Sequence, residues 1–175
     1  MNHVRRTLAA VTAALVVGVL PGPAHASVAS AADATANRTV ATRTIDTAAY
    51  GRRVLTLTNE RRARHGCHAL RWQYQLQRSA QQHTNLMSSR DVLSHLLASE
   101  LGLVARILRV GYHPWSRLAE NIAVGYTTPA QVVTAWMHSP EHRRNILDCR
   151  LRDLGVGVRL DDYGTVWWTQ DFGRH

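Results

Sequence analysis

The strongest constraint on the fold is a change of hydrophobic period near the C-terminus. Residues 155–160 and 165–172 alternate with the period of two that strands show, and the turn-forming segment 161–164 joins them. This pattern predicts an antiparallel hairpin in which one of Trp167 and Trp168 points inward and the other outward, for cross-strand packing or a ligand surface. Helical spacing precedes the hairpin and no nucleotide-binding loop occurs, so we expect an α+β layered domain and not a βαβ fold.

Helical periodicity predicts five helices before the hairpin. The second helix presents Leu76, Ala80, His83 and Met87 on one face, so His83 should point inward. The expected helices begin at Asp46 or Thr47, follow Trp72, run from 101 to 108, and open at Thr128-Pro129 and at Ser139-Pro140, with a short extended piece over 120–124.

Residues 1–26 have the pattern of a secretory signal peptide. Two arginines precede an apolar run over residues 8–20, and Ala24-His25-Ala26 supplies the small residues of a cleavage site. The run is shorter than the ~20 residues that span a bilayer, and no later segment is apolar enough to stop transfer. We expect cleavage after Ala26 and a secreted product without a transmembrane segment; a retained N-terminal anchor is the alternative. Residues 27–45 then form a flexible linker, and residues 46–175 form the domain.

The charge of the chain is positive and carried only by arginine. Without residues 1–26, 19 arginines and 12 acidic residues remain, a formal charge of +7. Arginine pairs well with phosphate and carboxylate, yet these arginines are scattered and export separates the protein from the genome. We therefore expect no nucleic-acid partner. Solvated helix faces account for most of the arginines, and an anionic envelope polymer or lipid is the favoured partner for the rest. A monomer is expected.

Cys67 and Cys149 are the only cysteines in the chain. An oxidising compartment favours a disulfide between them, and closing a loop of about 80 residues contributes about 4.5 kcal/mol in the chain-entropy model. The alternative is a zinc site that combines both thiolates with His68 or His142. Neither cysteine belongs to a C-x2-C pair, which argues against it.

Three short segments carry side chains that could act together: His95 after Ser94, Glu120 before Asn121, and the pair Glu141-His142. Taken singly, each has a structural interpretation, as a loop histidine, a structural hydrogen bond or a first-turn dipole pairing. His142 lies in the first turn of a helix, where a protonated imidazole is unfavourable, so a neutral ring is predicted.

The order of these segments resembles the CAP superfamily (the SCP domain), which contains cysteine-rich secretory proteins, insect venom antigens, plant pathogenesis-related proteins and many exported bacterial proteins. The resemblance covers about Val54 to Gly173. Its motifs are Leu57-Thr58-Asn59-Glu60-Arg61-Arg62, Leu70-Arg71-Trp72, Ser94-His95, Glu120-Asn121-Ile122-Ala123, Trp136-Met137-His138-Ser139-Pro140-Glu141-His142-Arg143, Gly155-Val156-Gly157-Val158 and Trp168-Thr169-Gln170-Asp171-Phe172-Gly173.

This resemblance implies a three-layer α-β-α sandwich with a small central antiparallel sheet. It also implies a surface cleft in which two histidines and acidic residues face one another. By position, His95 matches the first cleft histidine, Glu120 the glutamate of the Glu-Asn motif, and His142 the second histidine. Eukaryotic members add a second glutamate before the second histidine; this chain has no clear equivalent, and Glu141 stands where glycine is usual.

Two imidazoles with one carboxylate and a water form an acceptable ligand set for Zn²⁺ or a similar divalent metal, so His95 and His142 are the expected metal ligands. Such binding should weaken in acid, because protonation of either ring removes a ligand. No cofactor is required for the function that we favour. Ser94 and Ser139 could act as nucleophiles only in principle, because a serine before histidine is usually a cap or turn residue.

The favoured function is a secreted binding module that presents its cleft and an apolar groove to a lipid, sterol, glycan or other envelope component. The resemblance implies lipid or sterol binding in some members and no general enzymatic activity. The chain has neither a Gly-x-Ser-x-Gly elbow nor a His-Glu-x-x-His helix. The alternative is a metal-assisted hydrolase, in which His95 and His142 hold the ion and Glu120 accepts a proton from the bound water.

Overall fold

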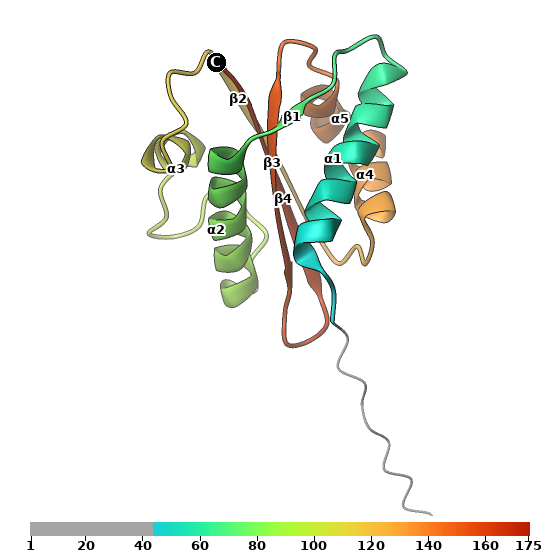
Figure 1. Ribbon diagram of the computed structural model, residues 1–175. Coiled ribbons are helices and arrows are strands. Elements are labelled where there is room, and N and C mark those ends of the chain that lie inside the picture. The colour runs from blue at the N-terminus through green and yellow to red at the C-terminus, as the bar shows by residue number, and fades with distance from the viewer. Residues whose placement is uncertain (1–43) are drawn as a thin grey trace, which may run out of the picture. The chain divides into compact units, whose positions relative to one another are not determined.

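The computed structural model describes residues 44–175; the expected signal peptide, its cleavage site and most of the expected linker lie outside the described residues. Five helices and four strands make up this part. In chain order (Figure 1) they are α1 (Thr47–Ala63), β1 (Arg71–Trp72), α2 (Tyr74–Arg90), α3 (Leu103–Arg109), β2 (Arg117–Val124), α4 (Pro129–His138), α5 (Pro140–Ile146), β3 (Asp153–Leu160) and β4 (Val166–Arg174).

The elements form the expected α+β sandwich of three layers. Helices α2 and α3 lie on one side of the sheet, and α1, α4 and α5 lie on the other (Figure 1). The strand order is β1-β3-β4-β2, in which β3, β4 and β2 pair antiparallel and the predicted hairpin is β3–β4. The prediction of an antiparallel sheet needs one correction, because β1 pairs parallel with β3. The two-residue β1 connects α1 to α2 across the sheet edge, and this path sets its direction.

Helix α2 packs directly on the backbone of β3. A Cβ atom on Gly155 would lie 2.0 Å from the backbone nitrogen of Gln77, and one on Gly157 would lie 2.4 Å from the carbonyl oxygen of Ala80. Only glycine permits this approach at both positions. The predicted inward face of α2 is confirmed, since Leu76, Ala80, His83 and Met87 are all fully buried.

The prediction of one outward tryptophan is wrong. Trp167 and Trp168 are only 3% and 0% exposed. They do point to opposite faces: Trp167 packs in a cluster with Met87 of α2, whereas Trp168 stacks on Tyr50 of α1 with ring centroids 6.0 Å apart. Because helices cover both faces of the sheet, neither ring is left for a ligand surface.

The helix starts follow the sequence signals. Asp46 caps α1 by accepting a hydrogen bond from the backbone of Ala49, and Ile45, the last residue of the expected linker, packs against the core. Thr128 and Gln131 form a capping box at α4. Ser139 ends α4 and precedes Pro140 of α5, but its side chain makes no capping bond, so the second Ser-Pro pair acts through proline alone.

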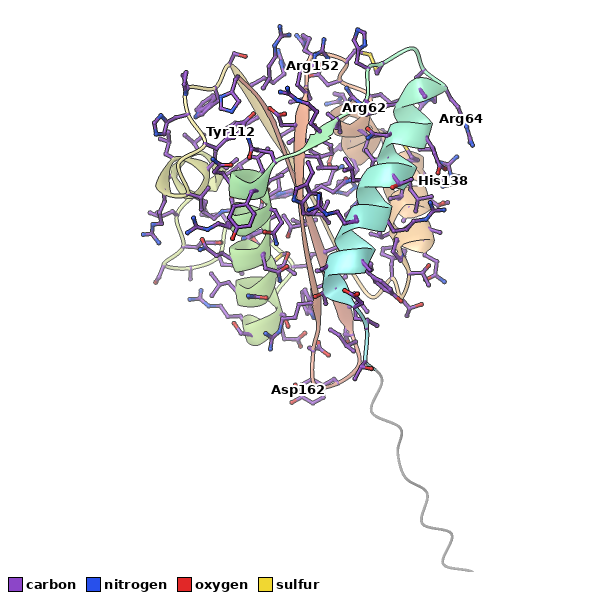
Figure 2. The ribbon with its side chains drawn as sticks, in the orientation of Figure 1. Arg62, Arg64, Tyr112, His138, Arg152 and Asp162 are labelled. Atoms are coloured by element: carbon purple, nitrogen blue, oxygen red, sulfur yellow. A yellow bond between two sulfur atoms is a disulfide. The ribbon has the colours of Figure 1, made fainter. Side chains whose placement is uncertain are left out.

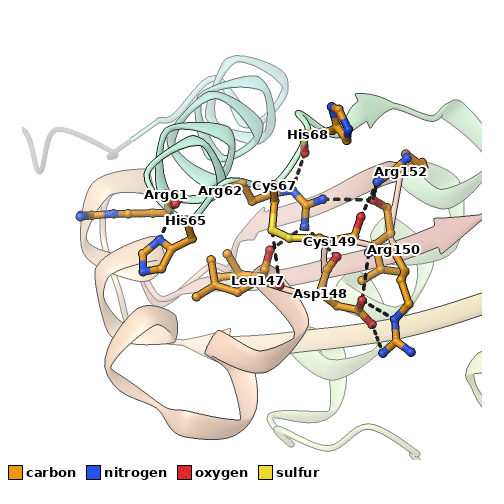
Figure 3. Close-up of a disulfide and its surroundings, with 12 residues drawn as sticks. Arg61, Arg62, His65, Cys67, His68, Leu147, Asp148, Cys149, Arg150 and Arg152 are labelled. Atoms are coloured by element: carbon orange, nitrogen blue, oxygen red, sulfur yellow. Dashed lines mark hydrogen bonds and ion pairs between the residues drawn. A yellow bond between two sulfur atoms is a disulfide. The ribbon is translucent and has the colours of Figure 1, made fainter.

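One end of the fold is held by a disulfide and a buried arginine (Figure 3). Cys67 and Cys149 are bonded, as predicted, which rules out the thiolate zinc site. Arg62 of α1 is fully buried, and its guanidinium donates to four backbone carbonyls. These belong to His68 at 3.0 Å, Ile146 at 2.7 Å, Asp148 at 3.0 Å and Leu151 at 3.0 Å.

Candidate functional site

The expected site residues gather at strand β2, which forms one edge of the sheet. Glu120 points from β2 toward α2 and α3, whereas Asn121 points to the opposite face. The side chain of Asn121 donates to the backbone carbonyl of His142 at 3.2 Å, and Asn145 of α5 donates to the backbone carbonyl of Glu120 at 3.0 Å. These bonds fasten α5, and with it His142, to the edge strand beside Glu120.

His95 reaches the same edge from the loop between α2 and α3. Its Nδ1 lies 2.7 Å from Oε1 of Glu120, while the imidazole remains 57% exposed. Ser94 holds this loop in a local turn, since its hydroxyl donates to the carbonyl of Leu96 and accepts from the Leu96 amide. Ser94 is therefore a turn residue. We refer to His95, Glu120 and His142 as the histidine–glutamate cluster.

Arg106, a buried arginine that we did not predict, contacts the other carboxylate oxygen of Glu120. Nη2 of Arg106 lies 2.5 Å from Oε2 of Glu120, and the arginine is only 5% exposed. Behind it, Oε1 of Glu100 lies 2.7 Å from Nδ1 of His83 and 3.6 Å from Nε of Arg106. The signal in the sequence for Arg106 was its position on the same side of α3 as the apolar residues Leu103 and Ile107, which pack inward.

Asp171 is a second residue near Glu120 that we did not predict. It lies directly opposite Glu120 in the pairing of β2 with β4 and is fully buried. Burial, and then the negative charge of Glu120, raise the pKa of Asp171 well above its usual range. Its ionised form is therefore disfavoured beside Glu120. The signal in the sequence for Asp171 was the period of two, which places this acid on the same strand face as Trp167 and Thr169, both buried.

The two histidines of the cluster have opposite charge preferences. The hydrogen bond to Glu120 raises the pKa of His95 despite its partial burial. Burial, and then the charge of His95, lower the pKa of His142, in agreement with the neutral ring predicted from its helix position. Burial alone would raise the pKa of Glu120, but the hydrogen bond from His95 and the charge of Arg106 lower it. These directions favour an imidazolium–carboxylate pair beside a neutral imidazole.

The arrangement does not fit a metal centre. Within residues 44–175, no group of three or more His, Cys, Asp and Glu side chains is placed to hold a metal ion. Catalytic zinc sites use three protein ligands. Here both oxygens of Glu120 are engaged, the cation Arg106 contacts it, and the raised pKa of His95 favours protonation of a predicted ligand. Glu141 is exposed and affects the two imidazoles only through its charge. We assign no step through a metal.

Proton titration by NMR should separate the two imidazoles. We expect His95 to titrate above, and His142 below, the ordinary histidine pKa of about 6.5. Because the pKa of His95 is raised by folding, its pairing with Glu120 stabilises the fold fully below about pH 6.5, and this contribution is lost as the pH rises through the folded-state pKa. Spectra of His95→Gln and His142→Gln assign the signals; the reverse order of the two pKa values would contradict the geometry.

Comparison with known proteins identifies the family. Residues 55–172 match the model of the cysteine-rich secretory protein family, CAP. The chain belongs to this family. The CAP chain is 32% identical over 153 residues to the uncharacterized protein YkwD of Bacillus subtilis, covering 86% of this chain and 58% of YkwD. It is 30% identical over 121 residues to the uncharacterized membrane protein YlbC of the same organism, covering 69% of this chain and 33% of YlbC. The chain thus spans about a third to three fifths of these relatives.

Solved structures show the same fold. An extracellular protein with an SCP domain from Bacillus anthracis matches with a TM-score of 0.66 and 29% identity, over 74% of this chain and 41% of that one. An outer surface protein of Borrelia burgdorferi matches with a TM-score of 0.69 over 77% of this chain and 98% of that one; at 19% identity it supports the fold alone. In the part of the CAP chain that is described, no helix is long and apolar enough to cross a membrane.

Proposed function

We propose that this CAP-family chain is secreted and acts outside the cell as a binding module for an amphipathic ligand of the cell envelope, a lipid or a sterol. The observation that carries this proposal is the setting of His95. The histidine is half-exposed, and the leucines beside it in the loop, Leu93 and Leu96, are 46% and 59% exposed. A polar donor between exposed leucines suits a ligand with a polar head and an apolar body.

The cluster supplies the polar half of the recognition. Glu120 holds His95 through Nδ1, and the second ring nitrogen, Nε2, has no hydrogen-bond partner among residues 44–175. A protonated His95 can donate from Nε2 to a phosphate, carboxylate or hydroxyl of a ligand. The neutral ring of His142 can donate or accept beside it. In this proposal Glu120 and Arg106 position the imidazole and do not contact the ligand.

Secretion is supported by the family and by the sequence outside the domain. The extracellular SCP protein of Bacillus anthracis shares the fold at 29% identity. Residues 1–26 carry the charge, apolar run and small residues of a signal peptide. The disulfide between Cys67 and Cys149 is typical of an oxidising compartment.

The alternative remains the metal-assisted hydrolase with His95, His142 and Glu120. The lowered pKa of His142 favours it, because an unprotonated nitrogen is what a metal requires. The engagement of Glu120 by Arg106 weighs against it, because a general base needs a free oxygen. Together these observations favour a binding function over hydrolysis.

Binding of a fluorescent fatty acid and a fluorescent sterol by the exported chain tests the proposal. We expect His95→Ala to weaken binding of at least one probe about tenfold, the scale of one charge-assisted hydrogen bond. Leu93→Ser combined with Leu96→Ser should weaken it at least as much. The matched control is His138→Ala, an exposed histidine of α4 on the opposite side of the sheet from α2 and α3 (Figure 2).

Two results would overturn this assignment. Equal affinity in all variants, or no uptake of either probe, would remove the lipid-binding role. Hydrolysis of ester, peptide or cell-wall substrates that requires Zn²⁺ and is lost in His142→Ala would establish the hydrolase instead. Circular dichroism of each variant checks that the fold is retained.

A further inference from the structure

Exposed apolar side chains gather in one short stretch of the chain. Of nine large hydrophobic residues that are exposed within residues 44–175, six fall between positions 92 and 108, and the other three are single tyrosines elsewhere. Isolated exposed hydrophobic residues are normal in soluble proteins, whereas a concentration of them marks a contact surface. The six are Val92, Leu93, Leu96, Leu101, Val104 and Leu108.

Helix α3 carries two of these six residues. Val104 and Leu108, at i and i+4, form an apolar stripe along one side of the helix, and Leu101 precedes the helix in the loop. The other side of α3 is also apolar, because Ile107 is buried and Leu103 packs in the same cluster. Figure 1 places α3 at the periphery of the molecule, beyond α2. The helix therefore has one apolar side packed in the fold and a second that has no cover among the described residues.

A positively charged hollow lies beside the apolar stripe. It measures about 430 Å³ and is lined by α2, α3 and the loop between them, with Arg90, Arg106 and Arg109 in its wall. The acidic residue in the wall, Glu100, is occupied by His83 and by the backbone of Leu97. Nη1 of Arg106 is buried without a hydrogen-bond partner in the described part of the chain. Arg106 is paired with Glu120, so the exposed guanidinium groups of the hollow are those of Arg109 and of Arg90, which also donates to the backbone carbonyl of Ala98. Two exposed guanidinium groups favour an anion, and phosphate fits them well.

We propose that the loop of residues 91–102 and helix α3 form a membrane-docking face for an anionic bilayer. The exposed leucines and valines enter the boundary between headgroups and acyl chains, and Arg90 and Arg109 hold a lipid phosphate. The charge of this face complements an anionic bilayer. Arg90 and Arg109 are exposed there, against one exposed carboxylate in residues 91–102, that of Asp91. This inference goes beyond the proposed function. Leu93 and Leu96 belong to both surfaces, whereas the stripe of α3 and the exposed arginines lie outside the ligand site of the histidine–glutamate cluster.

Cosedimentation of the exported chain with lipid vesicles tests the docking face. The vesicles consist of phosphatidylcholine with or without phosphatidylglycerol. We expect binding to the mixed vesicles that weakens as salt is raised, and little binding to phosphatidylcholine alone. Val104→Ser with Leu108→Ser should reduce binding about tenfold or more, and Arg109→Gln about fivefold, the scale of one arginine near an anionic surface.

Matched controls exclude non-specific effects. Tyr163→Ser removes a 96% exposed aromatic residue from the β3–β4 turn, and Arg64→Gln removes an exposed arginine at the end of α1 (Figure 2). Both should bind like the wild type. All variants share one N-terminus, so residues 1–43 cannot produce a difference between them. Val104→Ser with Leu108→Ser should still bind the fluorescent fatty acid or sterol like the wild type, which separates failure of the docking face from failure of the cluster.

Three outcomes would overturn the inference. Folded wild-type protein that sediments with neither kind of vesicle has no membrane-docking face. Equal loss of binding in the stripe variant and in Tyr163→Ser would make the attraction non-specific. Release of the protein from vesicles by millimolar glycerol phosphate would show that the hollow takes a free phosphate and not a bilayer.

Discussion

Gly155→Ala should destabilise the domain more than any other single methyl group added to it. The new Cβ would lie 2.0 Å from the backbone nitrogen of Gln77 and 2.1 Å from the carbonyl carbon of Leu76. These are backbone atoms of a 17-residue helix, so no side chain can move aside to relieve the contact. Overpacking of a tight core costs roughly 1–3 kcal/mol and occasionally more, and we expect at least about 3 kcal/mol here.

Urea and thermal denaturation followed by circular dichroism measure this effect. The matched control is Gly102→Ala, where a Cβ would meet no atom within 4 Å and the backbone φ of −60° suits alanine. We expect Gly102→Ala to leave the unfolding midpoint nearly unchanged. Similar midpoints for the two variants would mean that α2 does not lie on β3 as described.

The second large effect is expected for Arg62→Met. Methionine keeps an apolar stem but donates no hydrogen bond, so the carbonyls that Arg62 serves near His68, Ile146, Asp148 and Leu151 lose their partner. An unsatisfied buried acceptor costs about 1–3 kcal/mol, and these costs do not add fully. We expect a loss of about 4 kcal/mol in the free energy of unfolding of the disulfide-bonded protein.

Urea denaturation of Arg62→Met beside Arg61→Met checks this prediction. Arg61 is the preceding residue of α1 and is only partly buried, and changes near the surface usually alter stability by less than about 0.5 kcal/mol. Arg62→Lys should lie between the two, because a lysine ammonium cannot span the four carbonyls. Equal stability of Arg62→Met and Arg61→Met would show that the guanidinium does not hold this end of the fold.

Local patterns predicted most of the architecture. The helical face of Leu76 and Met87, the proline at the start of α4 and the strand alternation of residues 155–172 are decided by neighbours in sequence, and all appear as expected. Trp167 and Trp168 show where such patterns stop. A period of two places them on opposite faces, but only tertiary structure decides that helices cover both faces.

The sequence indicated three residues of the candidate site and missed two that lie against Glu120. The resemblance placed His95, Glu120 and His142, and the structure brings His95 and Glu120 into contact with His142 beside them. Arg106 and Asp171 were missed because their partnership with Glu120 arises only when α3 and β4 pack against β2. This partnership weighs against the predicted metal site, since a carboxylate held by a guanidinium makes a poorer metal ligand.

The fastening of α5 to strand β2 has a consequence for self-association. An uncovered sheet margin offers its amides and carbonyls to a strand from another molecule, which is how ordered aggregates grow. Asn145 already occupies the carbonyl of Glu120, and Asn121 ties α5 down beside it. The contact that positions His142 therefore also covers part of this edge against pairing with a strand of another molecule.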